Sequence, residues 1–238
     1  MTPLDRVTNS RGIAVEPERV SRGDPFAAVF TDRGPAGTSR PRGPTVNLRS
    51  TCGRGIVLHV ERWVAHPPAE EDRVLDRALG PVLDVGCGPA RHTLELVRRG
   101  ISARGLDSSR ELVRLARRRG APVLLGSVFA PLPEEGRWGT VLLLDGNVGI
   151  GGDPDRLLRR VRELTCPGGR VLVETEPPAT GSHRLEVVLE IDGSRQTDPF
   201  PWALVAADDL DVPAGGAGLR PAERWEEEGR WFARLDAP

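Results

Sequence analysis

The chain has 238 residues, with 33 basic residues, all of them arginine, against 34 acidic residues and a formal net charge of -1. This near-balance gives no reason to expect nucleic acid or an anionic membrane as a partner, because such binding shows as a basic excess or stripe. Lysine and tyrosine are absent, so reactions that need a Schiff-base lysine or a catalytic tyrosine are excluded.

Residues 1–45 contain six prolines and five glycines, and their few apolar residues follow no sustained period, which predicts a flexible segment. The chain shows neither the apolar core of a signal peptide nor a run of ~18 apolar residues. The three cysteines, Cys52, Cys87 and Cys166, lack C-x-x-C spacing, so they suggest neither a zinc site nor a disulfide framework. We therefore expect a cytoplasmic protein without a metal or a membrane partner.

A single domain is predicted for residues 46–238. It opens with an N-terminal extension, residues 46–67, in which apolar residues on both sides of a glycine loop predict a hairpin. An amphipathic helix is predicted next, for residues 68–79, because Gly80 and Pro81 follow it as a stop.

Strands and helices then alternate every ~25–30 residues, which predicts an α/β fold with a doubly wound, mostly parallel sheet. Ser108 and Glu111 have the spacing of a capping box, and Asp153-Pro154 supplies an N-cap with a proline in the first helical turn. Residues 167–169 are interpreted as a helix stop. The predicted strands are 82–85, 102–107, 123–125, 140–144 and 170–176, and the predicted helices are 91–99, 108–119 and 155–164.

The tail departs from this alternation. Residues 177–205 are predicted to be a lid-like insertion that carries strands at 185–191 and 202–205. Pro213 and the glycines at 215–216 interrupt the final helical pattern, so the last crossover is predicted to be a loop. Residues 219–227 and 230–235 flank Gly229, which predicts a closing antiparallel hairpin.

The strongest local signal is a strand that runs into a glycine turn and then a helix. Gly86 and Gly88 permit a tight turn with bare backbone close to a ligand, and the helix that follows presents unpaired N–H donors. Asp107 ends the next strand, where its carboxylate can accept the hydroxyl protons of a ribose. A nicotinamide fingerprint requires a glycine where Arg91 stands, so the pattern favours a nucleoside over a dinucleotide.

Together these motifs resemble a class I S-adenosylmethionine-dependent methyltransferase, from about residue 68 to the C-terminus. The matching segments are 82–89, 105–109, 126–129, 138–145 and 164–173. The resemblance implies a Rossmann-like, seven-stranded sheet and S-adenosylmethionine as cofactor, with Ala90 in place of the family's third glycine and Ser127 in place of its adenine-side aspartate. The residues it implies for the cofactor are Asp84, Gly86, Cys87, Gly88, Asp107, Ser108, Ser127, Val128 and Asp145.

The acceptor is expected at the carboxyl ends of the fourth and fifth strands, beside the loop 145–153. Asn147 is a candidate to orient a nucleophile and Asp145 to act as a base, with His92 as a third catalytic candidate. The sequence leaves structural alternatives open: Asp145 as a strand cap, Asn147 as a left-handed turn residue, and His92 as an exposed or capping side chain. Trp202 and His183 either cover the substrate pocket or pack within a small lid.

The leading hypothesis is an enzyme that methylates a small molecule. The alternatives are a non-catalytic cofactor-binding or interaction module and an NAD(P)-dependent oxidoreductase. The acceptor and the oligomeric state have no signal in the sequence. A cluster of arginines, Arg114 and residues 117–119, is interpreted as a solvated helix face.

Overall fold

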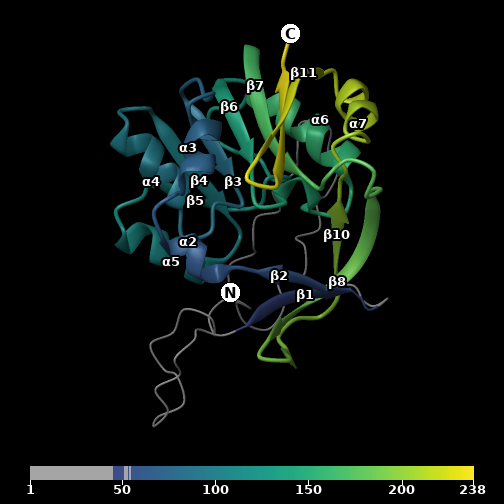
Figure 1. Ribbon diagram of the computed structural model, residues 1–238. Coiled ribbons are helices and arrows are strands. Elements are labelled where there is room, and N and C mark those ends of the chain that lie inside the picture. Colours follow the sequence, from purple (N-terminus) through teal and green to yellow (C-terminus); the bar gives the residue numbers. More distant parts are fainter. Residues whose placement is uncertain (1–44, 51–52, 54) are drawn as a thin grey trace, which may run out of the picture.

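The computed structural model describes residues 45–50, 53 and 55–238 (Figure 1). The segment predicted to be flexible, residues 1–45, therefore lies outside the described residues except for Thr45, and so does Cys52.

The central feature is a seven-stranded sheet in the order β11-β12-β7-β6-β3-β4-β5. The five strands from β7 to β5 are parallel, whereas β12 pairs antiparallel with β7 and β11 with β12. This arrangement confirms the prediction of a doubly wound, mostly parallel sheet with a closing hairpin. The strands are β3 (Val82–Val85), β4 (Ala103–Asp107), β5 (Val123–Leu125), β6 (Trp138–Leu143), β7 (Thr165–Thr175), β11 (Arg220–Glu227) and β12 (Arg230–Asp236).

Helices cover both faces of this sheet (Figure 1). On one face, α6 (Pro154–Leu164) and α7 (Asp211–Gly216) enclose a core with Val141 and Val173. On the other face lie α3 (Ala69–Leu75), α4 (Arg91–Arg98) and α5 (Arg110–Arg118). Strand β6 is buried along its whole length, as expected for a parallel strand covered on both sides. Among the described residues, no helix has the length and apolar character that crossing a membrane requires.

The helix N-termini agree with one local prediction and correct another. Asp153 caps α6, with its carboxylate accepting a hydrogen bond from the Arg156 amide at 3.2 Å. The predicted cap at Ser108 is wrong by one residue: the Ser109 hydroxyl accepts from the Leu112 amide at 3.1 Å, and Ser108 is exposed before the helix. The capping box is therefore not formed, because Glu111 lies in the first turn of a helix whose cap is Ser109.

Three other predicted boundaries are corrected. Helix α3 ends at Leu75 rather than at residue 79. Residues 167–169 do not separate a helix from a strand: β7 starts at Thr165, directly after α6, and these residues form an irregularity in its pairing with β6. The last crossover is a short helix, α7, and not a loop. Pro213 is its third residue, where a proline removes no intrahelical hydrogen bond because the first-turn amides have no partner.

A second, antiparallel sheet has the order β10-β8-β1-β2, with β9 paired to β8. It joins the predicted N-terminal hairpin, β1 (Val46–Ser50) and β2 (Gly55–Leu58), to the predicted insertion strands β8 (His183–Ile191), β9 (Ser194–Arg195) and β10 (Phe200–Leu204). Leu48 on β1 lies opposite Leu189 on β8, and both are buried with Val60 of the short helix α2 (Val60–Val64). Figure 1 shows this sheet below the main one.

Candidate functional site

The glycine turn lies at the carboxyl end of β3, as predicted. The amides of Gly86 and Cys87 both donate to the Leu106 carbonyl on β4, at 2.8 and 3.1 Å, which fixes the turn against the neighbouring strand. Gly86 has φ +70° and Gly88 has φ +52°. A Cβ on Gly86 would lie 2.7 Å from the side-chain amide nitrogen of Asn147, whereas a Cβ on Gly88 would meet nothing within 4 Å. Gly86 is therefore required for packing, and Gly88 borders open space.

Asp107 stands beside this turn at the tip of β4. One carboxylate oxygen accepts from the Gly88 amide at 2.8 Å, and the other accepts from the Ser109 amide at 2.8 Å. Because each carboxylate oxygen can accept more than one hydrogen bond, these contacts orient the group and leave it chemically suited to hydroxyl donors. The structure thus brings together the two glycines and the carboxylate that the sequence analysis placed at one site.

The predicted adenine loop follows β5. The Ser127 hydroxyl accepts from the Phe129 amide at 3.3 Å, which stabilises the turn. The Val128 side chain is only 4% exposed and packs in the core, while its carbonyl accepts from the Arg160 guanidinium at 2.9 Å. The side chain of Val128 therefore belongs to the core, and its carbonyl is held by Arg160.

Two predicted cofactor residues, Asp84 and Cys87, and Ala90, which stands in place of the family's third glycine, have side chains that pack against neighbouring elements. Asp84 is 2% exposed and accepts from the Thr93 hydroxyl at 2.8 Å, which ties α4 to β3, and burial raises its pKa. The Cys87 sulfur packs where a Cβ on Gly105 would fall 2.5 Å away, and burial raises the pKa of this thiol well above its usual value. The Ala90 methyl is fully buried in a cluster with Val113, not in the path of a ligand.

Asp145, which is itself exposed, is the outer member of a largely buried ion-pair network that the sequence did not reveal. The Arg91 guanidinium donates hydrogen bonds to both carboxylate oxygens of Glu71, at 2.8 Å each, and also donates to Asp145 at 2.8 Å. Arg230, from the closing hairpin, donates to both carboxylate oxygens of Glu174 at 2.8 Å and to Glu71 at 2.6 Å. These five residues come from α3, α4, β7, β12 and the loop after β6, so the network connects these elements at one end of the sheet.

His92 lies in the same network and not at the surface. Its ring nitrogen Nε2 is 2.8 Å from Glu71, and the residue is 4% exposed. Burial alone would raise the pKa of Glu71, but the hydrogen bonds from His92 and Arg91 hold it well below its usual range. The expectation of an exposed or capping histidine is therefore wrong, and the contact with Glu71 favours a structural role.

Asn147 connects the loop after β6 to the glycine turn. It opens the single 3₁₀ turn η1 (Asn147–Gly149), and its side-chain amide donates to the carbonyls of Val85 and Gly86 at 2.9 and 3.1 Å. The loop that was expected beside the acceptor therefore lies against the glycine turn. The amide group is engaged in holding them together, so its geometry is that of a positioning residue.

Part of the chain matches a known protein family. Residues 82–169 match a family model described as "Methyltransferase domain". Over these residues the chain is similar to methyltransferases, and its fold is that of solved S-adenosylmethionine-dependent methyltransferases. The sequence itself matches none of the curated proteins with which it was compared.

Solved structures of methyltransferases share this fold. A SAM-dependent methyltransferase from Bacteroides fragilis, in complex with S-adenosyl-L-homocysteine, is 23% identical with a TM-score of 0.69, covering 89% of this chain and 94% of that one. The CcbJ methyltransferase from Streptomyces caelestis is 22% identical with a TM-score of 0.55, covering 74% and 92%. The 1,6-didemethyltoxoflavin-N1-methyltransferase from Burkholderia thailandensis is 17% identical with a TM-score of 0.53, covering 75% and 83%.

The main sheet and its helices meet the second sheet beside η1. A Cβ on Gly149 would lie 2.8 Å from the Trp202 indole nitrogen, so the 3₁₀ turn and β10 are in close contact. A small hollow of about 40 Å³ opens here, at the carboxyl ends of β6 and β7. Burial, and then the neighbouring Glu174, raise the pKa of Glu176 in its lining. The lining residues are Gly146, Val148, Glu174, Thr175, Glu176, Ala203, Leu204 and Val205.

The residues missed by the sequence analysis are Glu71, Glu174 and Arg230. Glu71 and Arg230 are 159 positions apart, and neither stands in a recognisable motif. The one available signal was the placement of Glu174 at the end of a predicted strand, next to the expected acceptor site.

Proposed function

We propose that this protein transfers a methyl group from S-adenosylmethionine to a small-molecule acceptor. The observation that carries the proposal is the pairing of Gly88 and Asp107, with open space over Gly88 where any side chain would intrude. This combination suits a nucleoside, because bare backbone admits the ligand and a carboxylate at the strand tip can accept hydrogen bonds from the ribose hydroxyls.

The residues present fit the cofactor. In the proposed arrangement, the turn 86–88 lies against the methionine moiety, Asp107 and Ser108 against the ribose, and the loop 127–128 against the adenine. Asp145, Asp84 and Cys87 support the walls of this site through their contacts with Arg91, Thr93 and the packed strand β4. When bound, S-adenosylmethionine supplies an electrophilic methyl carbon.

The protein's own contribution is alignment and exclusion of water, because displacement at a sulfonium carbon requires an in-line approach more than it requires an acid or base. Asn147 holds η1 on the glycine turn, and β10 covers η1 from the second sheet. We propose that this contact sets the distance between acceptor and cofactor. Asp145 is the candidate for a direct part in the reaction. His92 is proposed as a positioning residue: it contacts Glu71, which holds Arg91, and Arg91 donates to Asp145.

A small-molecule acceptor is proposed because the second sheet lies against η1 and partly covers the carboxyl ends of β6 and β7, where the acceptor is expected. The Burkholderia thailandensis enzyme was crystallised with 1,6-didemethyltoxoflavin, which is a small molecule. Free thiols at Cys87 and Cys166 support a reducing, cytoplasmic compartment.

Calorimetric titration with S-adenosylhomocysteine tests the cofactor site. We expect saturable binding that Asp107→Ala weakens by about 1.5–3 kcal/mol, because the substitution removes a charged hydrogen-bond acceptor. Thermal melting of the variant controls for loss of fold. Absence of binding by the wild type at millimolar ligand contradicts the proposal.

Incubation with methyl-labelled S-adenosylmethionine and pooled metabolites then separates an enzyme from a binding module. A labelled product confirms transfer, whereas cofactor binding without any labelled product favours a non-catalytic module. Saturable binding of NAD(P) in place of S-adenosylhomocysteine would instead favour an oxidoreductase.

A further inference from the structure

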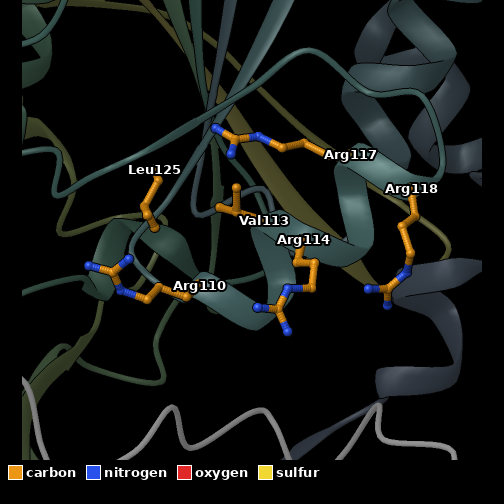
Figure 2. Close-up of a pocket in the computed structure, with 6 residues that line it drawn as sticks. All are labelled: Arg110, Val113, Arg114, Arg117, Arg118 and Leu125. Carbon is orange, nitrogen blue, oxygen red and sulfur yellow. The ribbon is translucent and has the colours of Figure 1, made fainter.

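A hollow of about 460 Å³ lies between α5 and the edge strand β5, apart from the residues assigned to cofactor and acceptor (Figure 2). Its floor is apolar: Val113 is buried, and Leu125 is 40% exposed. Four arginines surround this floor, namely Arg110, Arg114, Arg117 and Arg118. Figure 2 shows their side chains spread around Val113 and Leu125.

These arginines differ from many others of the chain in their partners. Elsewhere arginines pair with carboxylates, as in Arg49–Glu190 at 2.7 Å and Arg184–Asp155 at 2.8 Å. Among the described residues, Arg114 is the one arginine around the hollow with such a partner, Glu111, at 3.1 Å. Arg117 donates to the Val123 carbonyl at 3.1 Å.

Arg110 and Arg118 are exposed, and within the part of the chain that the structure describes they have no carboxylate within ion-pair distance.

The spacing of these cations raises the energy of the helix. Arg110 and Arg114 are four residues apart, as are Arg114 and Arg118, and like charges at this spacing on a helix repel each other. A bound anion would relieve this repulsion.

Phosphate is the anion that best matches guanidinium groups, because the planar fork donates two parallel hydrogen bonds to its oxygens. The row from Arg110 to Arg118 rises about 12 Å along the helix, which is more than one phosphate group spans.

The position of the hollow separates it from the cofactor site. Arg110 follows the Ser109 cap, and Leu125 precedes the adenine loop, so one end of the hollow adjoins the nucleoside side of the domain. The rest of the hollow extends along α5 as far as Arg118. None of its six lining residues is among those assigned to the cofactor.

We propose that this hollow is a second ligand site, which takes a small molecule carrying at least two linked phosphate groups. The guanidinium groups hold the phosphates, and the apolar floor accommodates the organic part. The site is independent of methyl transfer, since it uses neither the glycine turn nor the hollow beside β6 and β7.

Calorimetry with pyrophosphate, at constant ionic strength, tests the site. The double variant Arg110→Gln/Arg118→Gln removes two exposed cations without breaking an ion pair. The matched control, Arg62→Gln/Arg159→Gln, removes two exposed arginines from α2 and α6. We expect saturable binding that the α5 variant weakens at least about tenfold and that the control leaves unchanged, because charge-assisted bonds to phosphate are lost only in the first. S-adenosylhomocysteine binding should be the same in all three proteins.

Three results would overturn the proposal. The first is no detectable heat with pyrophosphate at ~10 mM, a concentration that reveals even weak sites. The second is an equal loss of binding in the control variant, which would reduce the effect to overall charge. The third is binding of a single-stranded oligonucleotide that depends on Arg110 and Arg118, without binding of pyrophosphate. Thermal melting shows whether the α5 variant folds, and relief of like-charge repulsion predicts an unchanged or raised Tm.

Discussion

At the scale of single residues, the two glycines of the turn have different constraints. Both have positive φ, so either substitution by alanine places an L-residue in the left-handed region, at about 1 kcal/mol. Only at Gly86 does the added methyl also collide with a neighbour, the side-chain amide of Asn147. Gly86 is therefore needed for the fold, whereas we expect Gly88 to be needed for ligand binding.

We expect Gly86→Ala to lower the free energy of unfolding by about 2–4 kcal/mol, because strain adds to the displacement of Asn147. Gly88→Ala should cost only about 1 kcal/mol of stability but abolish detectable S-adenosylhomocysteine binding, because its methyl enters the open space. Chemical denaturation and calorimetry measure the two effects. Normal cofactor affinity in Gly88→Ala would show that the ligand does not pass over this turn.

The site was predictable at the residues whose partners are close along the chain or set by strand order. Asp107 could be assigned because adjacent parallel strands end at the same edge of the sheet. The network of Glu71, Arg91 and Arg230 could not, because a long side chain can reach any of several partners and nothing in the sequence says which one it meets. His92 was misjudged for the same reason: its environment depends on Glu71, which is 21 residues away.

At the scale of elements, short-range signals predicted helix starts with an error of one residue. Asp153 was found because a proline follows it in the first turn, where only an N-terminal position tolerates proline. The adjacent serines 108 and 109 have the same chemistry, and the choice between them depends on the strand end that precedes them. Pro213 was interpreted as a break because a helix as short as α7, in which the third residue is still in the first turn, was not anticipated.

The competing serines provide a matched experiment. Ser109→Ala should lower the free energy of unfolding by about 1 kcal/mol, because the Leu112 amide loses its acceptor at the start of α5. Ser108→Ala should change stability by less than about 0.5 kcal/mol, since this residue is exposed before the helix. Urea denaturation of the two variants measures the difference. Equal destabilisation would mean that the cap is shared.

At the scale of the whole molecule, two sheets share one chain. The parallel sheet was predictable from the alternation of buried strands and amphipathic helices. The second sheet was not, although its hairpin and its insertion strands were each expected. Pairing between β1 and β8 is set by contacts of Val46, Leu48 and Val187 that no local pattern encodes.

The second sheet should respond to mutation as one unit. Leu48 is 4% exposed between Ile56 and Leu189, so Leu48→Ala should cost about 2–4 kcal/mol locally. Hydrogen exchange should then become faster in β1, β8 and β10 but not in β3 or β6. Val57→Ala, which shortens a side chain that is 56% exposed on the neighbouring strand β2, is the control. Faster exchange throughout the main sheet would show that the two sheets unfold together.

Acid should destabilise the molecule through its paired carboxylates. Hydrogen bonds from Arg98 lower the pKa of Glu95 to about 2, and the pKa of Glu71 also lies below its usual range. A carboxylate with a depressed folded-state pKa contributes stability above its unfolded value, roughly 4.3, and this contribution is lost as the pH falls toward 2.

The free energy of unfolding should therefore decrease from about pH 4.5 downwards, with a shallower slope in Glu95→Gln, which cannot take up this proton. Denaturation curves recorded at a series of pH values from 6 downwards measure how the free energy of unfolding changes with pH. Identical slopes in the variant and the wild type would mean that Glu95 has the same pKa in the folded and unfolded chain.

The pairing of β1 with β8 also has a consequence for synthesis of the chain. Arg49 and Glu190, which join the two strands, are 141 positions apart. At ribosomal rates of about 5–20 residues per second, the N-terminal hairpin waits on the order of 10 s before its partner strand emerges. During that interval the β1 edge is an open template for other nascent chains, so a chaperone that shields it early should raise the yield of native protein.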